Sequence, residues 1–429
     1  MKSYRSAMNS LTQALGVLMV FVLIFPTALV NATLFLLLVA YCVGGGYRDK
    51  WRRIWSHPVA VASLSLFGLF AVGISYSSAN LPTALGSLNH YRELLLLPLA
   101  ISVFNEDCWR RRAYNAFIAA ILVALAVSFA MRLGWAPPWP VAPDAGATSA
   151  IPFKSRIAYG FFLAFAAYLM IHHLLRSRIL WQRILWGSAA CLAAFNLLFM
   201  TSGRTGHVIF AAMTLLLIYQ YWGGLRKRGL IIVAVTIIAI IGAALTSPAM
   251  KSRSSDIDLI ASNPEHSSIG IRLIMWQTAS RIIADHPILG SGTGSFAGEY
   301  AKKSYDHPSI QTGNPHNEYL LIVAQLGILG LAGFLFLLYR QLRESVVLAQ
   351  PYSFAAQGLV LAMAVGCLFN SFLYDHGEGH FFAIYAGMLF SGASSKNVYA
   401  HPDFATSQHA ATDRGCAEFR MRQAGAAAP

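Results

Sequence analysis

The chain has 429 residues, of which 56% are hydrophobic and only 12% are charged. Because soluble domains carry about 25% charged residues, this composition excludes a water-soluble globule and predicts an integral membrane protein. The formal net charge of +14 favours basic loops at an anionic membrane surface over a nucleic-acid partner.

Apolar runs long enough to cross a bilayer recur along most of the chain. A membrane helix needs about 17–25 predominantly apolar residues. We therefore predict an all-α polytopic transmembrane domain over residues 1–393 with about twelve spans. They are placed at 11–26, 28–45, 58–78, 89–104, 114–133, 157–174, 180–200, 205–221, 229–246, 317–339, 353–373 and 380–393.

The loops between these spans alternate in charge. About two thirds of the Lys and Arg residues fall in one set of loops and in the two terminal segments, as the positive-inside rule requires of the cytoplasmic side. We therefore expect an inner-membrane protein with both termini in the cytoplasm. The segment 394–429 is rich in Ala, Gly, Ser and Gln, which predicts a disordered cytoplasmic tail.

One long insertion, residues 247–316, lies on the opposite, periplasmic side between the ninth and tenth spans. A connection of this length usually carries function. Within it, residues 269–286 have apolar positions at 269, 273, 276, 279, 282 and 283, which predicts an amphipathic helix. Arg272 and Arg281 lie off most of that stripe, so they can face a polar site or lipid headgroups.

The sequence HPILGSGTGSF, residues 286–296, follows that helix. Its three alternate glycines resemble a phosphate loop, but no strand precedes them and no Gly-Lys-Ser/Thr follows. A tight turn lying over the membrane is the favoured interpretation. The five cysteines are scattered and never form a Cys-x-x-Cys pair, so they predict neither a disulfide framework nor a zinc site.

The strongest local pattern is NPHNEYL, residues 314–320, at the start of a long apolar run. Asn314 is a suitable N-cap and Pro315 a suitable first helical residue, which places His316 in the first turn. There the helix dipole favours a neutral imidazole, and free N–H groups can hold an anion. A purely structural histidine in a capping region is the alternative.

Two arginines stand at the outer ends of predicted helices, where the positive-inside rule makes basic residues uncommon. Arg204 follows Thr201-Ser202-Gly203, and Arg156 begins another helix on the same side. A guanidinium binds phosphate oxygens in bidentate fashion, which suits a lipid pyrophosphate. Contact with outer-leaflet phosphates is the alternative for both side chains.

The short segment 374–380, YDHGEGH, is predicted to be an external turn between the last two spans. It gathers two carboxylates and two histidines. A metal site is conceivable there, but we favour ion pairs or hydrogen bonds to the arginines, with Asp375 as a supporting residue of the site. No metal ion and no other cofactor is predicted.

With these residues in view, the chain resembles the O-antigen ligase family, GT-C-like membrane glycosyltransferases that use glycans linked to polyprenyl pyrophosphate. The resemblance covers the predicted topology and a progression from Arg272 through HPILGSGTGSF and PHNEYL to GILG at 327–330. It implies transfer of O-antigen polysaccharide from undecaprenyl pyrophosphate to a sugar hydroxyl of lipid A-core, at the periplasmic face and without metal or nucleotide.

The family's essential histidine matches His316, and its essential arginines match Arg204 and Arg272. Its aspartate matches Asp375, and Arg156 matches by position at a helix start. Within the PHNEYL motif, Asn317 and Tyr319 are expected to contact substrate. The resemblance then implies His316 as general base and an arginine clamp on the pyrophosphate.

Three other functions stay open. An O-antigen polymerase is favoured by the spacing of Arg281 and Gly292, which ten residues separate. A protein O-oligosaccharyltransferase would use the same donor. A transporter of polyprenyl-linked glycans would show an internal repeat and charges at the bilayer midplane, and the ionisable residues instead cluster at the ends of the spans.

Overall fold

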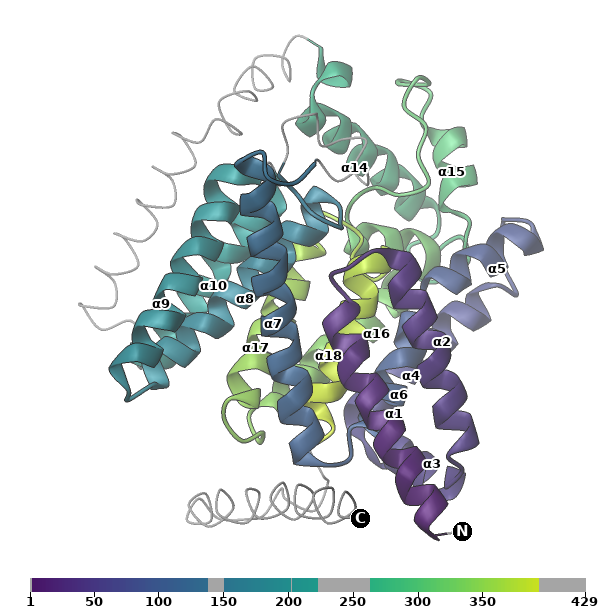
Figure 1. The fold of residues 1–429 in the computed structure, drawn as a ribbon. Coiled ribbons are helices and arrows are strands. Elements are labelled where there is room, and N and C mark those ends of the chain that lie inside the picture. Colours follow the sequence, from purple (N-terminus) through teal and green to yellow (C-terminus); the bar gives the residue numbers. More distant parts are fainter. Residues whose placement is uncertain (1, 138–149, 202, 223–262, 393–429) are drawn as a thin grey trace.

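The computed structural model describes residues 2–137, 150–201, 203–222 and 263–392 (Figure 1). Within these ranges every regular element is a helix, which confirms the all-α prediction. The helices are α1 (Lys2–Val22), α2 (Thr27–Val43), α3 (Tyr47–Ser56), α4 (Pro58–Gly73), α5 (Leu81–His90), α6 (Glu93–Val103), α7 (Asp107–Arg132), α8 (Arg156–Arg176), α9 (Leu180–Phe195), η2 (Asn196–Met200), α10 (Arg204–Trp222), η3 (Pro264–His266), α14 (Ser268–Asp285), α15 (Phe296–Lys303), α16 (Glu318–Ser345), α17 (Tyr352–Gly366) and α18 (His376–Phe390).

Four of the described helical stretches are long and apolar enough to cross a membrane: α7, α8, the stretch Leu180–Met200 and α16. The pair α2 and α3 makes a fifth if it counts as one broken span, and α4 and α17 are shorter apolar helices. The chain is therefore a helical membrane protein. The total of about twelve spans stays a prediction, and the span expected at 229–246, the first part of the 247–316 loop and the 394–429 tail lie outside the described residues.

Two predicted spans are interrupted. The apolar run 89–104 was expected to form one helix, but α5 ends at His90 and α6 begins at Glu93, so that part of the prediction is wrong. The run 353–373 is helical only to Gly366, and the residues after it form an irregular segment. Polar side chains lie at both breaks. Their effect is lost when hydropathy is averaged over a long window.

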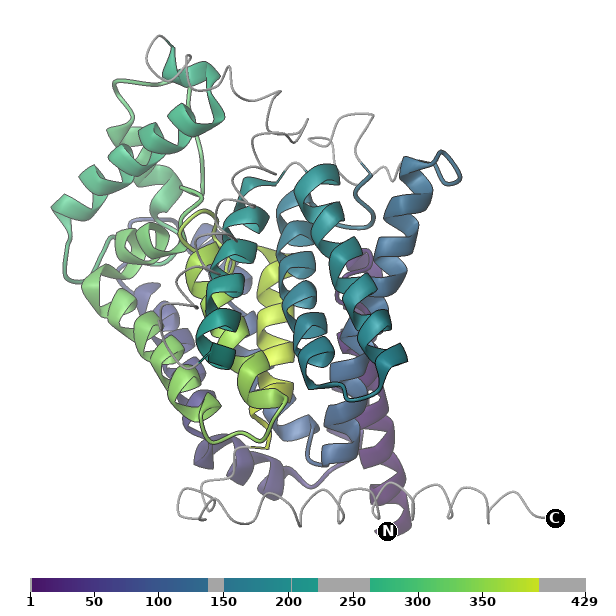
Figure 2. The ribbon, with the colours of Figure 1, turned by 90° about the vertical axis from the view of Figure 1, so that its left-hand side faces the viewer.

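The core of the bundle is built around α8 and α18. Nearly every side chain of α8 from Ala158 to Met170 is buried, as is α18 from Glu378 to Phe390. A helix that is apolar on all sides is stable only when other helices surround it. Figures 1 and 2 show α8 and α18 inside the bundle, with α14 and α15 gathered at the end opposite the N-terminus.

The helix α16 is broken at Gly327, whose backbone φ is 62° and ψ −160°. The glycine-rich segment 286–295 fits against this break: the N–H groups of Ser291 and Gly292 donate to the carbonyls of Ala324 and Gln325, and Ile328 N–H donates to the Pro287 carbonyl. These bonds use backbone groups that the broken helix would otherwise leave without partners. The segment is a turn, as expected, and backbone hydrogen bonds hold it against α16.

The glycines in this turn are needed for close contact as well as for conformation. Gly290 has a φ of 69°, and a Cβ atom there would lie 2.3 Å from the carbonyl carbon of Gln325. A Cβ at Gly327 would lie 2.1 Å from the Ile288 oxygen. The backbones of the turn and of α16 therefore touch directly at both positions.

We expect Gly290→Ala to destabilise the protein by roughly 2–4 kcal/mol, because the new methyl group must displace the α16 backbone and adopt a left-handed conformation. The matched control is Gly298→Ala in α15, where a Cβ would meet nothing within 4 Å and alanine favours the helix. Thermal unfolding of the two purified variants in detergent measures the difference. Equal midpoints for the two variants would contradict the proposed contact.

The helix α14 confirms the predicted helix at 269–286, but its buried face differs from the predicted one. Ala279 and Ile282 of the predicted stripe are buried, but Leu273 is 49% exposed, and Ile274 and Met275, which lie outside the stripe, are buried instead. The buried set faces α15 and the first turns of α16. The predicted stripe is therefore rotated, because two helices, rather than a flat membrane surface, define which positions are covered.

Candidate functional site

The backbone before α16 differs from the prediction around His316. The N-cap of α16 is Asn317, whose side-chain oxygen accepts the Leu320 N–H, and not Asn314. The side-chain oxygen of Asn314 instead accepts hydrogen bonds from the His316 N–H and the Ser371 hydroxyl. His316 thus precedes the helix and has a φ of +52°, a left-handed conformation that only a few per cent of non-glycine residues adopt.

His316 begins a chain of hydrogen bonds that ends at a carboxylate. Its Nδ1 lies 2.9 Å from Oδ1 of Asn370, and Nδ2 of Asn370 donates to Oδ2 of Asp375 over 2.7 Å. Because the Asn370 amide nitrogen faces the carboxylate, its oxygen faces the imidazole. Nδ1 of His316 therefore carries the proton and donates it, which leaves Nε2 as the basic nitrogen.

The environment of His316 favours the neutral ring. Burial lowers the pKa of His316, its hydrogen bond to Asn370 opposes that shift, and the positive charge of Arg272 lowers the pKa further. The predicted cause, a place in the first helical turn, is thus replaced by burial and a neighbouring guanidinium. Burial also raises the pKa of Asp375, and the hydrogen bond from Asn370 partly offsets that effect.

The irregular segment 367–375, which carries Asn370 and Asp375, is held by Glu318 at the start of α16. One Glu318 carboxylate oxygen accepts the N–H groups of Leu373 and Tyr374, and the other lies 3.4 Å from the hydroxyl of Tyr91. Glu318 is fully buried. Its carboxylate fixes this segment relative to His316, two residues earlier in the chain.

Arg204 and Arg156 begin the neighbouring helices α10 and α8 at one end of the bundle. A π-helical turn, η2, precedes Arg204 and is anchored where Asn196 donates to the Ser128 hydroxyl. A Cβ at Gly203 would lie 2.8 Å from the Arg156 carbonyl oxygen, so only glycine allows the two helix starts to approach this closely. The structure therefore brings the first residues of these two helices together.

The start of α8 also adjoins the start of α18, directly after Asp375. A Cβ on Gly377 would lie 3.8 Å from Cβ of Ala158, and the rings of Phe161 and Phe372 have centroids 5.1 Å apart. Burial lowers the pKa of Lys154, and the charge of Glu378 in α18 opposes that shift. The segment 367–378 thus lies between His316 and the helix that Arg156 begins.

Three other predicted residues have structural partners. Nδ2 of Asn317 donates to the Leu368 carbonyl, and the Tyr319 hydroxyl donates to the Ala364 carbonyl over 2.8 Å, so both tie α16 to the α17 region. Arg281 pairs with Asp306 at 2.5 Å and lies over the ring of Tyr305. These contacts of Arg281 hold residues 303–306 against α14.

The predicted turn 374–380 ends at Asp375, because α18 already begins at His376. Within this helix Gly379 permits close packing, because a Cβ there would lie 3.1 Å from Cγ of Glu93. His376 and His380 lie one helical turn apart, and each has a nitrogen near Oε1 of Glu93, at 3.5 Å and 3.0 Å.

Among the described residues, Glu93, His376 and His380 could together hold a metal ion, since each offers one ligand atom and these atoms lie within 4.8 Å of one another. The guanidinium of Arg92, however, lies 3.3 Å from Nδ1 of His376. A fixed positive charge at that distance disfavours a bound cation. The group fits a buried network of charged and polar side chains better than a metal centre.

Sequence reasoning missed the residues that connect the site. Asn370 was assigned to a membrane span, although the adjacent Asn370 and Ser371 are conspicuously polar in the apolar run CLFNSFLY. Glu318 was part of a quoted motif but was given no role. Trp276 was counted only in the apolar stripe of the predicted helix, but its indole N–H donates to the Pro315 carbonyl over 3.0 Å.

The fold and this site define a polytopic helical membrane protein with a polar, arginine-containing centre at one end of its bundle. A family model described as O-antigen ligase matches residues 189–335. This match confirms the resemblance drawn from the sequence over residues 189–335. The matched range includes Arg204, Arg272 and His316, whereas Arg156 and Asp375 lie outside it.

A second comparison finds an uncharacterized protein of Haemophilus influenzae that is 23% identical over 256 residues. The matched residues make up 56% of this chain and 61% of that protein, so the chain spans less than two thirds of the relative's length. That likeness carries no activity to this chain.

Proposed function

We propose that the protein is an O-antigen ligase, which transfers O-antigen polysaccharide from undecaprenyl pyrophosphate to a sugar hydroxyl of lipid A-core. The observation that carries the proposal is the series of hydrogen bonds from His316 through Asn370 to Asp375, with the charge of Arg272 acting on His316. It supplies a neutral base next to a permanent cation, which glycosyl transfer from a pyrophosphate requires. The family match supports the same class of reaction.

In the proposed reaction, the acceptor hydroxyl oxygen attacks the anomeric carbon of the first O-antigen sugar. The bond from that carbon to the pyrophosphate oxygen breaks, and undecaprenyl pyrophosphate leaves with the electron pair. The hydroxyl proton moves to Nε2 of His316, a transfer that typically contributes 10²- to 10⁴-fold. Because the attack is direct, the anomeric configuration inverts.

Arginines take the role that a metal ion plays with poorer leaving groups. Arg272 and Arg204 balance the charge that develops on the pyrophosphate, and Arg156 extends this positive surface at the start of α8. Asp375 acts through Asn370 and holds His316 in the Nδ1-protonated form. Asn317 and Tyr319 fix the frame of α16 from which the substrate is contacted.

Both substrates are lipids, so the reaction belongs in the bacterial inner membrane, with the site at the periplasmic face and both termini in the cytoplasm. The described basic segments support this orientation, because α3, the start of α7 and the α8–α9 and α16–α17 connections lie at the bundle end that also holds the N-terminus (Figure 1). Membrane lipids are the other partners, and no nucleic-acid partner is proposed.

The test is ligation by the purified protein, with undecaprenyl-pyrophosphate-linked O-antigen as donor and lipid A-core as acceptor. We expect product of inverted configuration and an unchanged rate after treatment with EDTA, because arginines rather than a metal ion neutralise the leaving group. Product formed only when a second lipid-linked glycan replaces lipid A-core would show a polymerase. Product formed only on a protein acceptor would show an oligosaccharyltransferase.

The structure gives no support to the spacing of Arg281 and Gly292, the observation that favoured a polymerase. Arg281 is engaged with Asp306, Tyr305 and the Lys303 carbonyl, so these contacts are with residues 303–306 and none is with His316. The ligase reaction is therefore the proposal that the site geometry supports best.

A further inference from the structure

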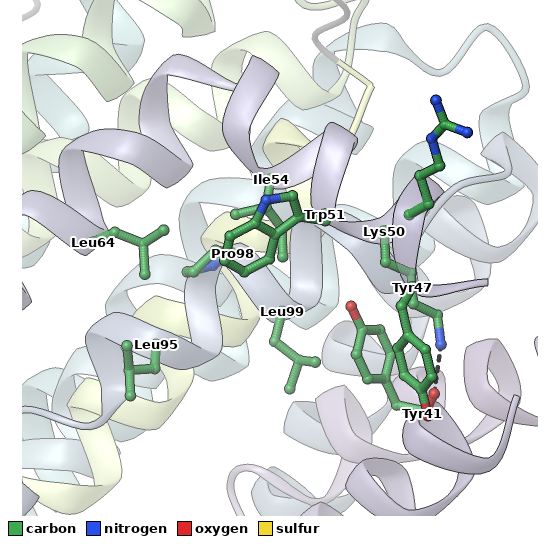
Figure 3. Close-up of a pocket in the computed structure, with 10 residues that line it drawn as sticks. Tyr41, Tyr47, Lys50, Trp51, Ile54, Leu64, Leu95, Pro98 and Leu99 are labelled. Atoms are coloured by element: carbon green, nitrogen blue, oxygen red, sulfur yellow. Dashed lines mark hydrogen bonds between the residues drawn. The ribbon is translucent and has the colours of Figure 1, made fainter. Parts of the chain in front are cut away.

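A groove at the opposite end of the bundle is unused by the proposed reaction. It is lined by Tyr41, Tyr47, Arg48, Lys50, Trp51, Ile54, Leu64, Leu95, Pro98 and Leu99 (Figure 3). These residues come from α2, α3, α4 and α6. Figure 3 shows the Trp51 indole above Pro98, with Leu64 and Leu95 on one side and Tyr41 and Tyr47 on the other.

The helix that forms one wall of the groove has the character of an element that lies along a membrane surface. α3 is bent by 114° from α2, and Gly45 and Gly46, with φ of 64° and 70°, make the bend possible. Trp51 is 64% exposed and Trp55 50% exposed. An amphipathic helix with exposed indoles and flanking cations is typical of the boundary between headgroups and acyl chains.

The opposite wall is rigid and apolar. Pro98 lacks the N–H that would bond the Leu94 carbonyl within α6, and the Ser63 hydroxyl of α4 donates to that carbonyl instead, over 2.7 Å. The Tyr41 and Ser102 hydroxyls are 2.7 Å apart and join α2 to α6. The groove is therefore shaped by contacts among three helices that hold without a ligand.

Cations stand at the rim of the groove. α3 contains Arg48, Lys50, Arg52 and Arg53 but only one acid, Asp49. Arg52 lies 3.6 Å from that acid, whereas Arg48 and Lys50 are the two cations that line the groove. The Lys50 ammonium lies 3.8 Å from the centre of the Tyr41 ring and donates to the Tyr41 carbonyl, which places its charge on the Tyr41 side of the groove.

We propose that this groove binds an anionic phospholipid of the leaflet that faces the N-terminus of the protein. The negatively charged headgroup contacts Arg48 and Lys50, and one acyl chain lies along Trp51, Leu95, Pro98 and Leu99. The charge of the rim selects an anionic lipid over a zwitterionic one, because each cation near such a surface favours the anionic lipid roughly fivefold.

The test uses the full chain in phosphatidylcholine nanodiscs that contain a minor fraction of lipid brominated on its acyl chains, since bromine quenches indole fluorescence on contact. Brominated phosphatidylglycerol is compared with brominated phosphatidylcholine at equal fraction. The signal of Trp51 is obtained as the difference between the wild type and Trp51→Phe. We expect the anionic lipid to quench Trp51 several-fold more efficiently.

Charge variants separate a specific site from general contact with lipid. Arg48→Gln and Lys50→Gln together should abolish the preference for brominated phosphatidylglycerol. Arg52→Gln and Arg53→Gln together, which remove the same charge from the same helix outside the groove lining, should keep it. Equal quenching by both lipids in the wild type would overturn the proposal, as would quenching by neither, and equal losses in the two charge variants would reduce it to bulk attraction.

Discussion

Replacing His316 with alanine should lower the rate of ligation by about 10²- to 10⁴-fold, the range typical of losing a general base. The protein should keep its fold and its affinity for the lipid-linked donor, because Nε2 of His316 acts only on the acceptor proton. The measurement is initial ligation rate with purified components. His286→Ala is the matched control, since His286 is an exposed histidine at the end of α14.

The same histidine should set the acidic limb of the pH profile. Only neutral His316 accepts a proton, and burial together with Arg272 holds its pKa below the ordinary value. Activity should therefore persist below about pH 6.5, the usual midpoint for histidine, and fall only at lower pH. Full activity in His316→Ala would contradict the assignment. An acidic limb of the pH profile that stays unchanged in both Asn370→Ala and Asp375→Asn would contradict it as well.

Arg272→Gln should reduce kcat/KM by roughly 10²- to 10³-fold, the loss seen when one preorganised donor to a developing anion is removed. Arg272→Lys should recover only part of this loss, because lysine keeps the charge but cannot bind two phosphate oxygens in a planar fork. Removing the cation should also move the acidic limb of the profile to higher pH, since Arg272 lowers the pKa of His316.

The control for Arg272 lies on the same helix. Arg281→Gln removes an equal charge from α14, but Arg281 pairs with Asp306, so this change should affect stability slightly and ligation little. Equal loss of activity in the two variants would show that the charge of α14, and not the position of Arg272, determines the rate.

Sequence patterns predicted much of the fold because apolar runs and charge alternation are local signals. The helices at 114–133, 157–174 and 317–339 were found this way. Hydropathy could not find the break in α16, because Gly327 sits in an apolar run and its conformation is required only by the turn that packs against it. At the break between α5 and α6, Glu93 contacts His376 and His380 of α18, and no local pattern relates those residues.

The sequence predicted individual residues of the site but not the hydrogen bonds that connect them. His316 and Arg272 were singled out, and the structure places the charge of Arg272 where it acts on His316. The bond of His316 to Asn370 spans 54 residues of sequence, and no spacing rule relates those positions. The N-cap was misplaced by three residues because Asn314 and Asn317 are equally good caps by residue type, and their contacts with Ser371 and Leu368, which lie far away in sequence, distinguish them.

The mutual fit of the glycine turn and the broken helix has a consequence for building chimeras between related enzymes. An experimenter who wishes to exchange external loops would naturally cut at the membrane boundary, between residues 295 and 318. Because Gly290 and Gly327 each leave room for the other segment's backbone, that cut would separate two halves of one interlocking unit. Residues 286–295 and 324–330 should therefore be inherited together from the same parent.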